Sequence, residues 1–354
     1  MSAVSTQLPV PAPRLVALLR SELLRARSRR SLAWMVTLAV LAVLAISALM
    51  WFSTGRVTQV ELDAAAQRFL SEQQVYYEQC LADPSIPEDQ RADFCWKPTG
   101  EEAAQNAQWN LDRRPFDQSS FEGVITFAGG IGALVCLLLA ATTGGADWGA
   151  RTMGLLLSWE PRRTRVFGVR VLVVVVLALV IEAALLAIAL GLGSLIAGAH
   201  TLEVTGGLDG SSLQPVDGGD ALALAVRWLP LAGLAAAGSF AVAMLTRSTG
   251  WAIGALIGFV AVVESVVQGV WAWGSQWLVQ TNIAAWLSGG IVWVVDRDAA
   301  QQGTVGYLEE GDADRLVGPG AILITDTRAL ATLAALVLAA ALLGWMSLLR
   351  RDVE

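Results

Sequence analysis

Six long apolar runs constrain the fold of this chain more than any other feature of its sequence. Each run reaches about 20 residues, the length at which an α-helix crosses the ~30 Å hydrocarbon core of a bilayer. They are continuous rather than alternating, which excludes the strand pattern of a membrane barrel. The runs are Leu32–Phe52, Gly123–Thr143, Gly168–Leu195, Ala221–Leu245, Trp251–Val270 and Thr327–Leu349. We predict an all-α polytopic membrane protein with six transmembrane helices, the first of them retained rather than cleaved as a signal peptide.

The distribution of basic residues predicts the orientation of these helices. Segments 1–31, 144–170, 246–250 and 350–354 together hold 14 of the 24 basic residues. The intervening segments 53–121 and 271–326 are long and acidic, and 199–220 contains no Lys or Arg. Because basic residues accumulate on the cytoplasmic side, this pattern predicts that both termini are cytoplasmic. The use of 23 arginines against one lysine indicates a GC-rich bacterial genome, and hence a bacterial inner membrane.

The segments outside the membrane divide into three expected parts. Residues 1–31 form a cytoplasmic tail followed by an amphipathic helix over 12–30, which could alternatively be a simple basic anchor. Residues 53–121 form an extracellular domain with helices over Gln59–Glu78 and Glu101–Leu111. In that oxidising compartment a Cys80–Cys95 disulfide is expected to join the two helices.

The outer segment 271–326 carries five tryptophans in 23 residues and is too apolar for a solvated loop. They are Trp271, Trp273, Trp277, Trp286 and Trp293. We interpret the segment as a re-entrant hairpin whose tryptophans lie at the outer headgroup level. A seventh complete span is the alternative, but it would place the C-terminal arginines outside. The block 122–349 then contains five further transmembrane helices.

The inner loop 144–167 is the most informative part of the chain. Asp147 precedes Thr152, and an apolar ridge (Leu155–Leu157) is followed by Pro161 and by the basic residues Arg162, Arg163 and Arg165. A short helix over Leu155–Trp159 would present both an apolar and a charged side, as elements that dock on a soluble partner do. The alternative is that the arginines only fix the orientation of the neighbouring helices.

This inner loop resembles that of type-2 ABC exporter permeases. Asp147 stands at the acidic position, Thr152 at the threonine, Pro161 with Arg162 or Arg163 at the Pro/Arg pair, and Arg170 at the following basic position. Arg151 stands where the pattern usually has glycine, and Asp147 replaces a commoner glutamate. The N-terminal helix, with Glu22 between Arg20 and Arg25, resembles the elbow helix of the family. The resemblance covers most of the chain except 53–121.

The resemblance implies a permease that works in pairs, with two separate ATPase subunits bound to the inner loop and elbow. The residues that it assigns to ATPase coupling are Asp147, Arg151, Thr152, Leu155, Leu156, Leu157, Trp159, Glu160, Arg162, Arg163 and Arg165, with Arg20 and Glu22. ATP and Mg would be bound by the partner subunit, and no cofactor or metal by this chain. A phosphate-binding loop needs a lysine after a glycine-rich turn, whereas the single lysine, Lys97, lies in the outer segment.

Three glycines and two acids stand out within the apolar runs. Gly250, Gly254 and Gly258 are spaced by four and would let another helix approach closely, either in this chain or in a second permease. Glu182 lies 12 residues after Arg170, roughly 18 Å along a helix, and is expected near the middle of the bilayer. A carboxylate there is a functional candidate, although a protonated structural role is the alternative. Glu264 is a candidate to line an exit vestibule.

We therefore predict a transport subunit, not an enzyme, that exports an amphiphilic compound such as a drug, a peptide or a lipid-like molecule. Its expected partners are two ATPase subunits, an identical or homologous permease and membrane lipids, with no nucleic acid. One alternative is an ion-coupled secondary transporter that uses Glu182. Another is a membrane anchor or sensor that acts through 53–121. The sole histidine, His200, cannot form a catalytic group or a zinc cluster within the chain.

Overall fold

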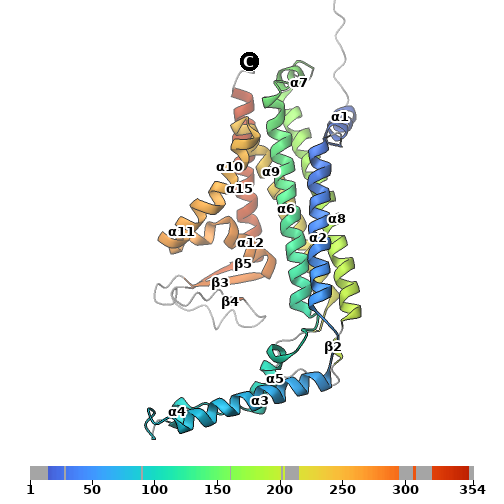
Figure 1. Cartoon of the computed structure of the whole chain (residues 1–354). Helices are drawn as coiled ribbons and strands as arrows, with labels where there is room; N and C mark the ends of the chain where they lie inside the picture. Colours follow the sequence, from blue (N-terminus) through green and yellow to red (C-terminus); the bar gives the residue numbers. More distant parts are fainter. Residues whose placement is uncertain are drawn as a thin grey trace, which may run out of the picture. The chain divides into compact units, whose positions relative to one another are not determined.

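The computed structural model describes residues 15–27, 29–88, 91–159, 161–200, 202–203, 215–294, 306–307 and 321–350. These residues are mostly helical, and six helices are long and apolar enough to cross a membrane (Figure 1). They are α2 (Arg30–Ser53), α6 (Gln118–Gly149), α8 (Arg163–Ala199), α9 (Gly218–Thr246), the continuous helix Thr249–Val270 and α15 (Asp326–Arg350). The six predicted spans are thus confirmed as long apolar helices, and the described chain is mostly helical, as expected of a polytopic membrane protein.

The chain divides into two compact units, which we describe separately. The first contains the described residues within Met1–Ala39, Gly129–Ala184 and Val226–Glu354. The second contains those within Val40–Ala128 and Leu185–Ala225. Helices α2, α6, α8 and α9 contribute residues to both units.

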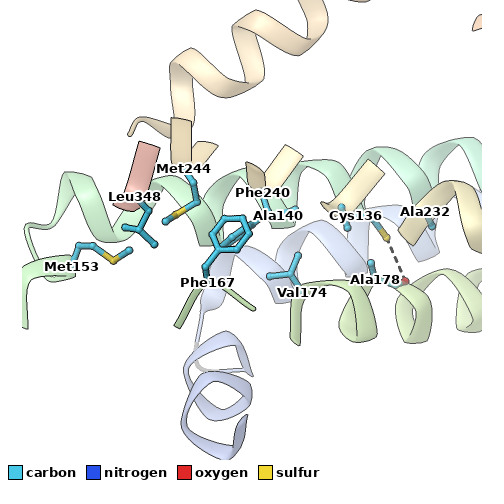
Figure 2. Packing of buried hydrophobic residues seen from close by; sticks show 11 residues of the cluster. Cys136, Ala140, Met153, Phe167, Val174, Ala178, Ala232, Phe240, Met244 and Leu348 are labelled. Carbon is cyan, nitrogen blue, oxygen red and sulfur yellow. Dashed lines mark hydrogen bonds between the residues drawn. The ribbon is translucent and has the colours of Figure 1, made fainter. Parts of the chain in front are cut away.

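The core of the first unit consists of small and aromatic side chains from several helices (Figure 2). Phe167 of α8 packs against Phe240 of α9, with 5.8 Å between ring centroids. Leu348 of α15 and Met153 join the same cluster. Close approach of the helices depends on glycine: a Cβ on Gly344 of α15 would lie 2.8 Å from the Ala241 carbonyl oxygen of α9. These contacts fix the ends of α6, α8 and α15 near the turn that carries the candidate site.

The Trp-rich segment of the first unit contains one short helix and a small sheet. After η3 (Ala272–Trp277) comes α12 (Val279–Ser288), followed by β3 (Gly290–Val294), β4 (Gly306–Tyr307) and β5 (Ala321–Thr325). The strands are antiparallel in the order β4-β3-β5, with Ile291 of β3 opposite Ile324 of β5. The 10 residues of α12 extend about 15 Å, too short to span a bilayer.

The sheet corrects the expectation of a purely helical chain in this region. The apolar run Ile291–Val294 is short, and a run of that length does not distinguish a strand from the end of a helical hairpin. The pairing partner β5 is 27 residues further along the chain, so no local pattern indicated it.

The second unit contains the predicted outer domain. Helix α3 (Gln59–Ala82) begins with a capping box in which Thr58 and Glu61 bond each other's backbone N–H. Helix α5 (Gly100–Asn106) begins with the same arrangement of Thr99 and Glu102, and continues as η1 (Ala107–Asn110). The predicted disulfide between Cys80 and Cys95 is present, next to the short helix α4 (Arg91–Phe94).

The base of this domain is joined to the ends of two long helices. Strand β1 (Val57–Thr58) pairs in parallel with β2 (Leu202–Glu203). His200, at the end of α8, lies 2.8 Å from the Thr54 hydroxyl through Nδ1, and its ring is 4.7 Å from that of Trp51. The only histidine of the sequence therefore connects two helix ends.

Candidate functional site: a buried charge cluster beside a short helix

The turn after α6 positions the inner-loop residues. Helix α6 ends at Gly149, and Arg151 has φ 56°, in the left-handed region that favours glycine. The Thr152 N–H donates to the Asp147 carbonyl at 3.0 Å, and the Thr152 hydroxyl donates to the Asp147 carboxylate at 3.5 Å. The next helix, α7 (Met153–Trp159), follows at once. Arg151 thus stands, at some conformational cost, in a backbone conformation that glycine adopts more readily.

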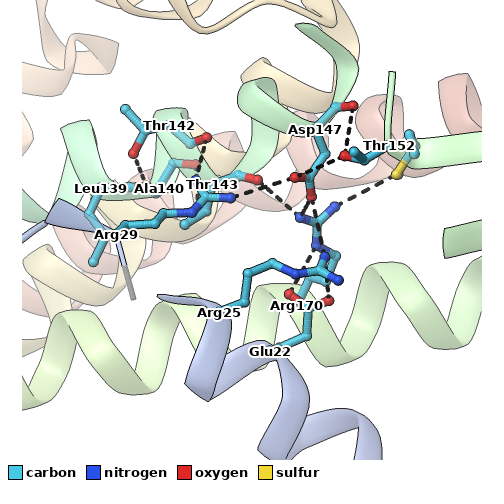
Figure 3. Close-up of polar contacts among 11 residues, drawn as sticks. Glu22, Arg25, Arg29, Leu139, Ala140, Thr142, Thr143, Asp147, Thr152 and Arg170 are labelled. Atoms are coloured by element: carbon cyan, nitrogen blue, oxygen red, sulfur yellow. Dashed lines mark hydrogen bonds and ion pairs between the residues drawn. The ribbon is translucent and has the colours of Figure 1, made fainter. Parts of the chain in front are cut away.

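Five charged side chains meet at this turn, and we call them the charge cluster: Glu22, Arg25, Arg29, Asp147 and Arg170 (Figure 3). Arg170 is at the centre and only 3% exposed. Its Nη2 pairs with Asp147 Oδ2, its Nε lies 3.6 Å from Glu22 Oε2, and its Nη2 also donates to the Thr143 carbonyl at 3.2 Å. One guanidinium therefore links α1 (Leu15–Arg27), α6 and α8.

Arg25 and Arg29 complete the cluster from the N-terminal side. Arg25 Nη1 lies 3.3 Å from Glu22 Oε1 and 3.7 Å from Asp147 Oδ2. Arg29, between α1 and α2, lies 3.6 Å from Asp147 Oδ1 and donates to the Thr142 carbonyl at 3.0 Å. Burial lowers the pKa of Arg29, and the nearby positive charges act in the same direction, while Asp147 opposes them. An arginine remains protonated even so, and Arg29 stays a cation.

The cluster has three positive and two negative side chains, and all five residues belong to the first compact unit. Glu22 and Asp147 are both buried, so removing Arg170 would leave two close carboxylates without their main counter-ion. A small hollow lies against the cluster, bordered by Thr143, Val173 and Val174 in addition to cluster residues. The arrangement mechanically connects α1 to the α6–α7 turn and to the start of α8.

Helix α7 has two different sides. Met153 is buried, and Leu156 and Leu157 pack against the core shown in Figure 2. Leu155 is 67% exposed. The expected apolar ridge is therefore divided, and only Leu155 of the three leucines presents an open side chain. Trp159 ends the helix, whereas Glu160 lies outside the described residues.

The basic residues that follow α7 also differ from one another. Arg163 donates to the carbonyls of Leu348 and Leu349 at 2.8 and 3.3 Å, and so caps the C-terminal end of α15. Arg165 is half-buried, while Arg162 and the Arg20 side chain of α1 are exposed. Arg163 thus has a clear packing role, and Arg162 is better placed to contact a partner.

Glu264 caps a helix. It is fully buried, and its carboxylate accepts the N–H groups of Val279 and Gln280 at 2.8 and 3.1 Å, at the start of α12. At the other end of α12, Arg227 of α9 donates to the carbonyls of Trp286 and Leu287 at 3.0 and 3.2 Å. The segment that carries Glu264, η2 (Phe259–Glu264), has π-helical geometry. A negative and a positive charge thus satisfy the two ends of α12.

The glycine row faces open space within the described part of the chain. A Cβ placed on Gly250, Gly254 or Gly258 would meet no atom within 4 Å. Trp251 and Ile257 on the same helix are 76% and 54% exposed. The glycine row was expected to pack against a helix of this chain or of a second permease. Among the residues that the structure describes, no part of this chain packs against it.

Glu182 lies apart from the charge cluster, in the middle of α8. It is fully buried, and neither carboxyl oxygen has a hydrogen-bond partner among the described residues. It packs against Gly132 of α6, where a Cβ would collide with the carboxyl group.

The structure brings together Asp147, Thr152 and Glu22 of the predicted set, and it adds three arginines. Arg25 was named only as a neighbour of Glu22 in the elbow-like helix, and Arg29 was counted only among the basic residues of segment 1–31. Arg170 was placed by resemblance but not included among the coupling residues. The sequence did indicate a role for Arg170, because it is an arginine inside an otherwise apolar run and such residues need a partner.

Comparison of the sequence with models of known protein families gives no match. Comparison with curated proteins likewise finds no match.

Proposed function

We propose that this chain is the permease subunit of an ATP-driven exporter, located in a bacterial inner membrane with both termini in the cytoplasm. The observation that carries the proposal is the connection between α1, the α6–α7 turn and α8 through Arg170. In this proposal α1 is the elbow helix, and α7 is the coupling helix that an ATPase subunit contacts. Because the charge cluster joins them, movement of α7 would be transmitted to α1 and α8 together.

Leu155 is the proposed contact point on α7. Its side chain is exposed on a helix whose Met153, Leu156 and Leu157 face the core. The exposed Leu155 and the exposed Arg162 of the same inner loop supply an apolar and a charged contact, which suits the groove of a soluble subunit. Two ATPase subunits would serve two permeases, and ATP and Mg would be bound by the ATPase.

The proposed second permease would contact the glycine row. Gly250, Gly254 and Gly258 have no neighbouring atom at their Cβ positions among the described residues, and small residues allow close helix approach in a membrane. The Trp-rich segment with α12 is the proposed re-entrant element at the outer side. Apolar helix walls without a series of charged residues favour an amphiphilic cargo, such as a drug, a peptide or a lipid-like molecule.

The test is purification of the tagged chain from its native cell in mild detergent. We expect a stoichiometric ATPase subunit and ATP hydrolysis in the purified fraction. Leu155→Ser should reduce both at least several-fold, because it removes the exposed apolar contact. Ser158→Ala on the same helix, which leaves Leu155 in place, is the matched control. Recovery of the wild-type chain without an ATPase would contradict the proposal.

A second candidate function is ion-coupled transport through Glu182, and the observation in its favour is that this buried carboxyl group has no partner. It predicts transport by the chain alone in liposomes, driven by a proton gradient and without ATP. Under this alternative Glu182→Gln should abolish transport, whereas Leu155→Ser should leave it unchanged.

A further inference from the structure

The buried Glu182 side chain has no charged partner on the helices around it. On α6, the neighbouring titratable group is Cys136, whose thiol donates to the Ala178 carbonyl at 3.4 Å. On α8 itself, Arg170 is 12 residues away, roughly 18 Å along the helix, and is engaged in the charge cluster. An ionised carboxylate without a partner is strongly unfavourable in an apolar interior, so Glu182 is held as the neutral acid.

A second buried polar group, on α9, also has no hydrogen-bond partner among the described residues. The indole Nε1 of Trp228 in α9 has no acceptor among the described residues, although Trp228 is only 7% exposed. Its ring packs against Gly129 of α6, where a Cβ would overlap the ring. A buried indole N–H normally has a hydrogen-bond partner, so this group requires an explanation.

The two groups converge on one face of α6. Gly129 and Gly132 are three residues apart in this helix, and positions with that spacing are neighbours about 5–6 Å apart. Glu182 contacts one glycine and Trp228 the other. The spacing of these two positions on α6 is of the same size as the span of two hydrogen bonds of about 2.9 Å made by a single oxygen atom.

We propose that Glu182 and Trp228 together form a binding site for one hydroxyl group, supplied either by the head of an amphiphile or by water. The hydroxyl oxygen accepts a hydrogen bond from the Trp228 indole and donates its own hydrogen to the carbonyl oxygen of the Glu182 acid. An ammonium group has no acceptor for the indole N–H, and an anion would have no counter-charge here. A hydroxyl provides both roles without a net charge.

The surroundings fit an amphiphile with such a head group. Ala178 and Leu185, one turn to either side of Glu182 on α8, are buried and apolar. Pro230, two residues after Trp228, lies inside α9 and cannot donate to the Val226 carbonyl, which provides a point where α9 can bend. Bending there would move the indole away from Gly129 and open the site.

The idea that an amphiphile supplies the hydroxyl group rests on the proposed permease function, whereas the existence of the site does not. We would therefore measure the purified full-length chain by infrared spectroscopy, without ATP or a partner subunit. The carbonyl band of a protonated carboxylic acid shifts to lower frequency when that carbonyl accepts a hydrogen bond. An amine-oxide detergent, which has no hydroxyl groups, avoids competition with the probes, dodecanol and dodecyl methyl ether.

Glu182→Gln should remove the carboxylic acid band. Glu264→Gln is the matched control, because it replaces a second buried acid outside the proposed site and should leave the band that depends on Glu182 unchanged. Trp228→Phe keeps an aromatic ring on Gly129 but removes the indole N–H. Gel filtration of each variant verifies that the fold is retained.

Two results would support the site and distinguish the sources. A band that shifts with dodecanol, but not with the ether or in Trp228→Phe, assigns the hydroxyl to an amphiphile. A band already at the hydrogen-bonded frequency, unchanged by dodecanol and raised in Trp228→Phe, assigns it to water. Absence of a band that depends on Glu182, or a band insensitive to both dodecanol and Trp228→Phe, overturns the proposal. Either failure leaves the ATPase copurification test unaffected.

Discussion

At the scale of single residues, Arg170 determines more of the candidate site than any other side chain. It contacts Glu22, Asp147, the Thr143 carbonyl and, through Nη1 at 3.7 Å, the sulfur of Met153. These groups belong to α1, to the end of α6 and to α7. A single buried cation therefore organises segments that are far apart in the sequence.

We expect Arg170→Gln to lower the free energy of unfolding by about 3–5 kcal/mol, because Glu22 and Asp147 would lose their buried counter-ion. The measurement is the midpoint of thermal unfolding in detergent, followed by loss of the monodisperse gel-filtration peak. Arg162→Gln is the control, since an exposed arginine should change stability by no more than about 0.5 kcal/mol. Equal midpoints for the two variants would contradict a central role of Arg170.

The sequence predicted residue types at this site better than their contacts. Asp147 and Thr152 were singled out in the inner loop and assigned their roles by the resemblance, and the structure places them in one turn. The division of the ridge Leu155–Leu157 was not predictable, because the side of α7 that faces the core depends on Phe167, Phe240 and other distant residues. Sequence spacing establishes that a helix has an apolar side, and tertiary packing determines which leucine remains exposed.

At the scale of elements, α12 shows how a short helix is stabilised in an apolar setting. Its N–H groups are capped by Glu264 and its carbonyl groups by Arg227. Both caps come from long helices, so they were not visible in the sequence of α12 itself. Glu264 was predicted to line a vestibule, and the structure gives it a capping role instead.

Glu264→Leu should weaken α12 at its first turn, because the N–H groups of Val279 and Gln280 lose a charged acceptor at a cost of about 1–3 kcal/mol for each hydrogen bond. The measurement is hydrogen exchange of the Val279 and Gln280 amides, which we expect to accelerate at least tenfold. Ser265→Ala is the control, since that exposed hydroxyl bonds only within its own helix at Ala261. Unchanged exchange in Glu264→Leu would show that the cap does not stabilise α12.

The start of α3 should be sensitive to acid. Backbone and side-chain hydrogen bonds from Thr58 lower the pKa of Glu61 below its ordinary value of 4.5. The capping box therefore contributes its full stability above pH 4.5 and loses it as the pH falls through the lower folded-state pKa. Amide protection factors in the first turn of α3, corrected for the intrinsic exchange rate, should fall in acid. Glu61→Gln, which cannot ionise, should show no such dependence.

At the scale of the whole molecule, the six spans were predictable because continuous apolar runs of this length have few alternatives. Their ends differ from the predicted ranges by at most six residues, most in α6 and α8, where polar turns extend the helices beyond the apolar runs. The sheet β4-β3-β5 was missed because its strands are short and far apart in sequence. Long-range pairing is the information that a single sequence carries least clearly.

The orientation in the membrane is a prediction of the whole chain. Alkaline phosphatase inserted after Ser85, in the turn between α3 and α4, should be active because that side is expected to be oxidising. A fluorescent protein fused at the C-terminus should fluoresce in the cytoplasm. The disulfide Cys80–Cys95 agrees with an outer location of the same turn. Inactive phosphatase at this position would contradict the predicted topology.

The π-helical segment Phe259–Glu264 has a consequence for how relatives of this chain should be aligned. A wide turn of this kind accommodates extra backbone, and one residue corresponds to about 100° of rotation along an α-helix. Deleting a single residue here would leave the glycine row in place but turn Glu264 away from the first turn of α12. A relative one residue shorter in this segment must therefore cap α12 from another position, and the length of this helix becomes a marker of its outer architecture.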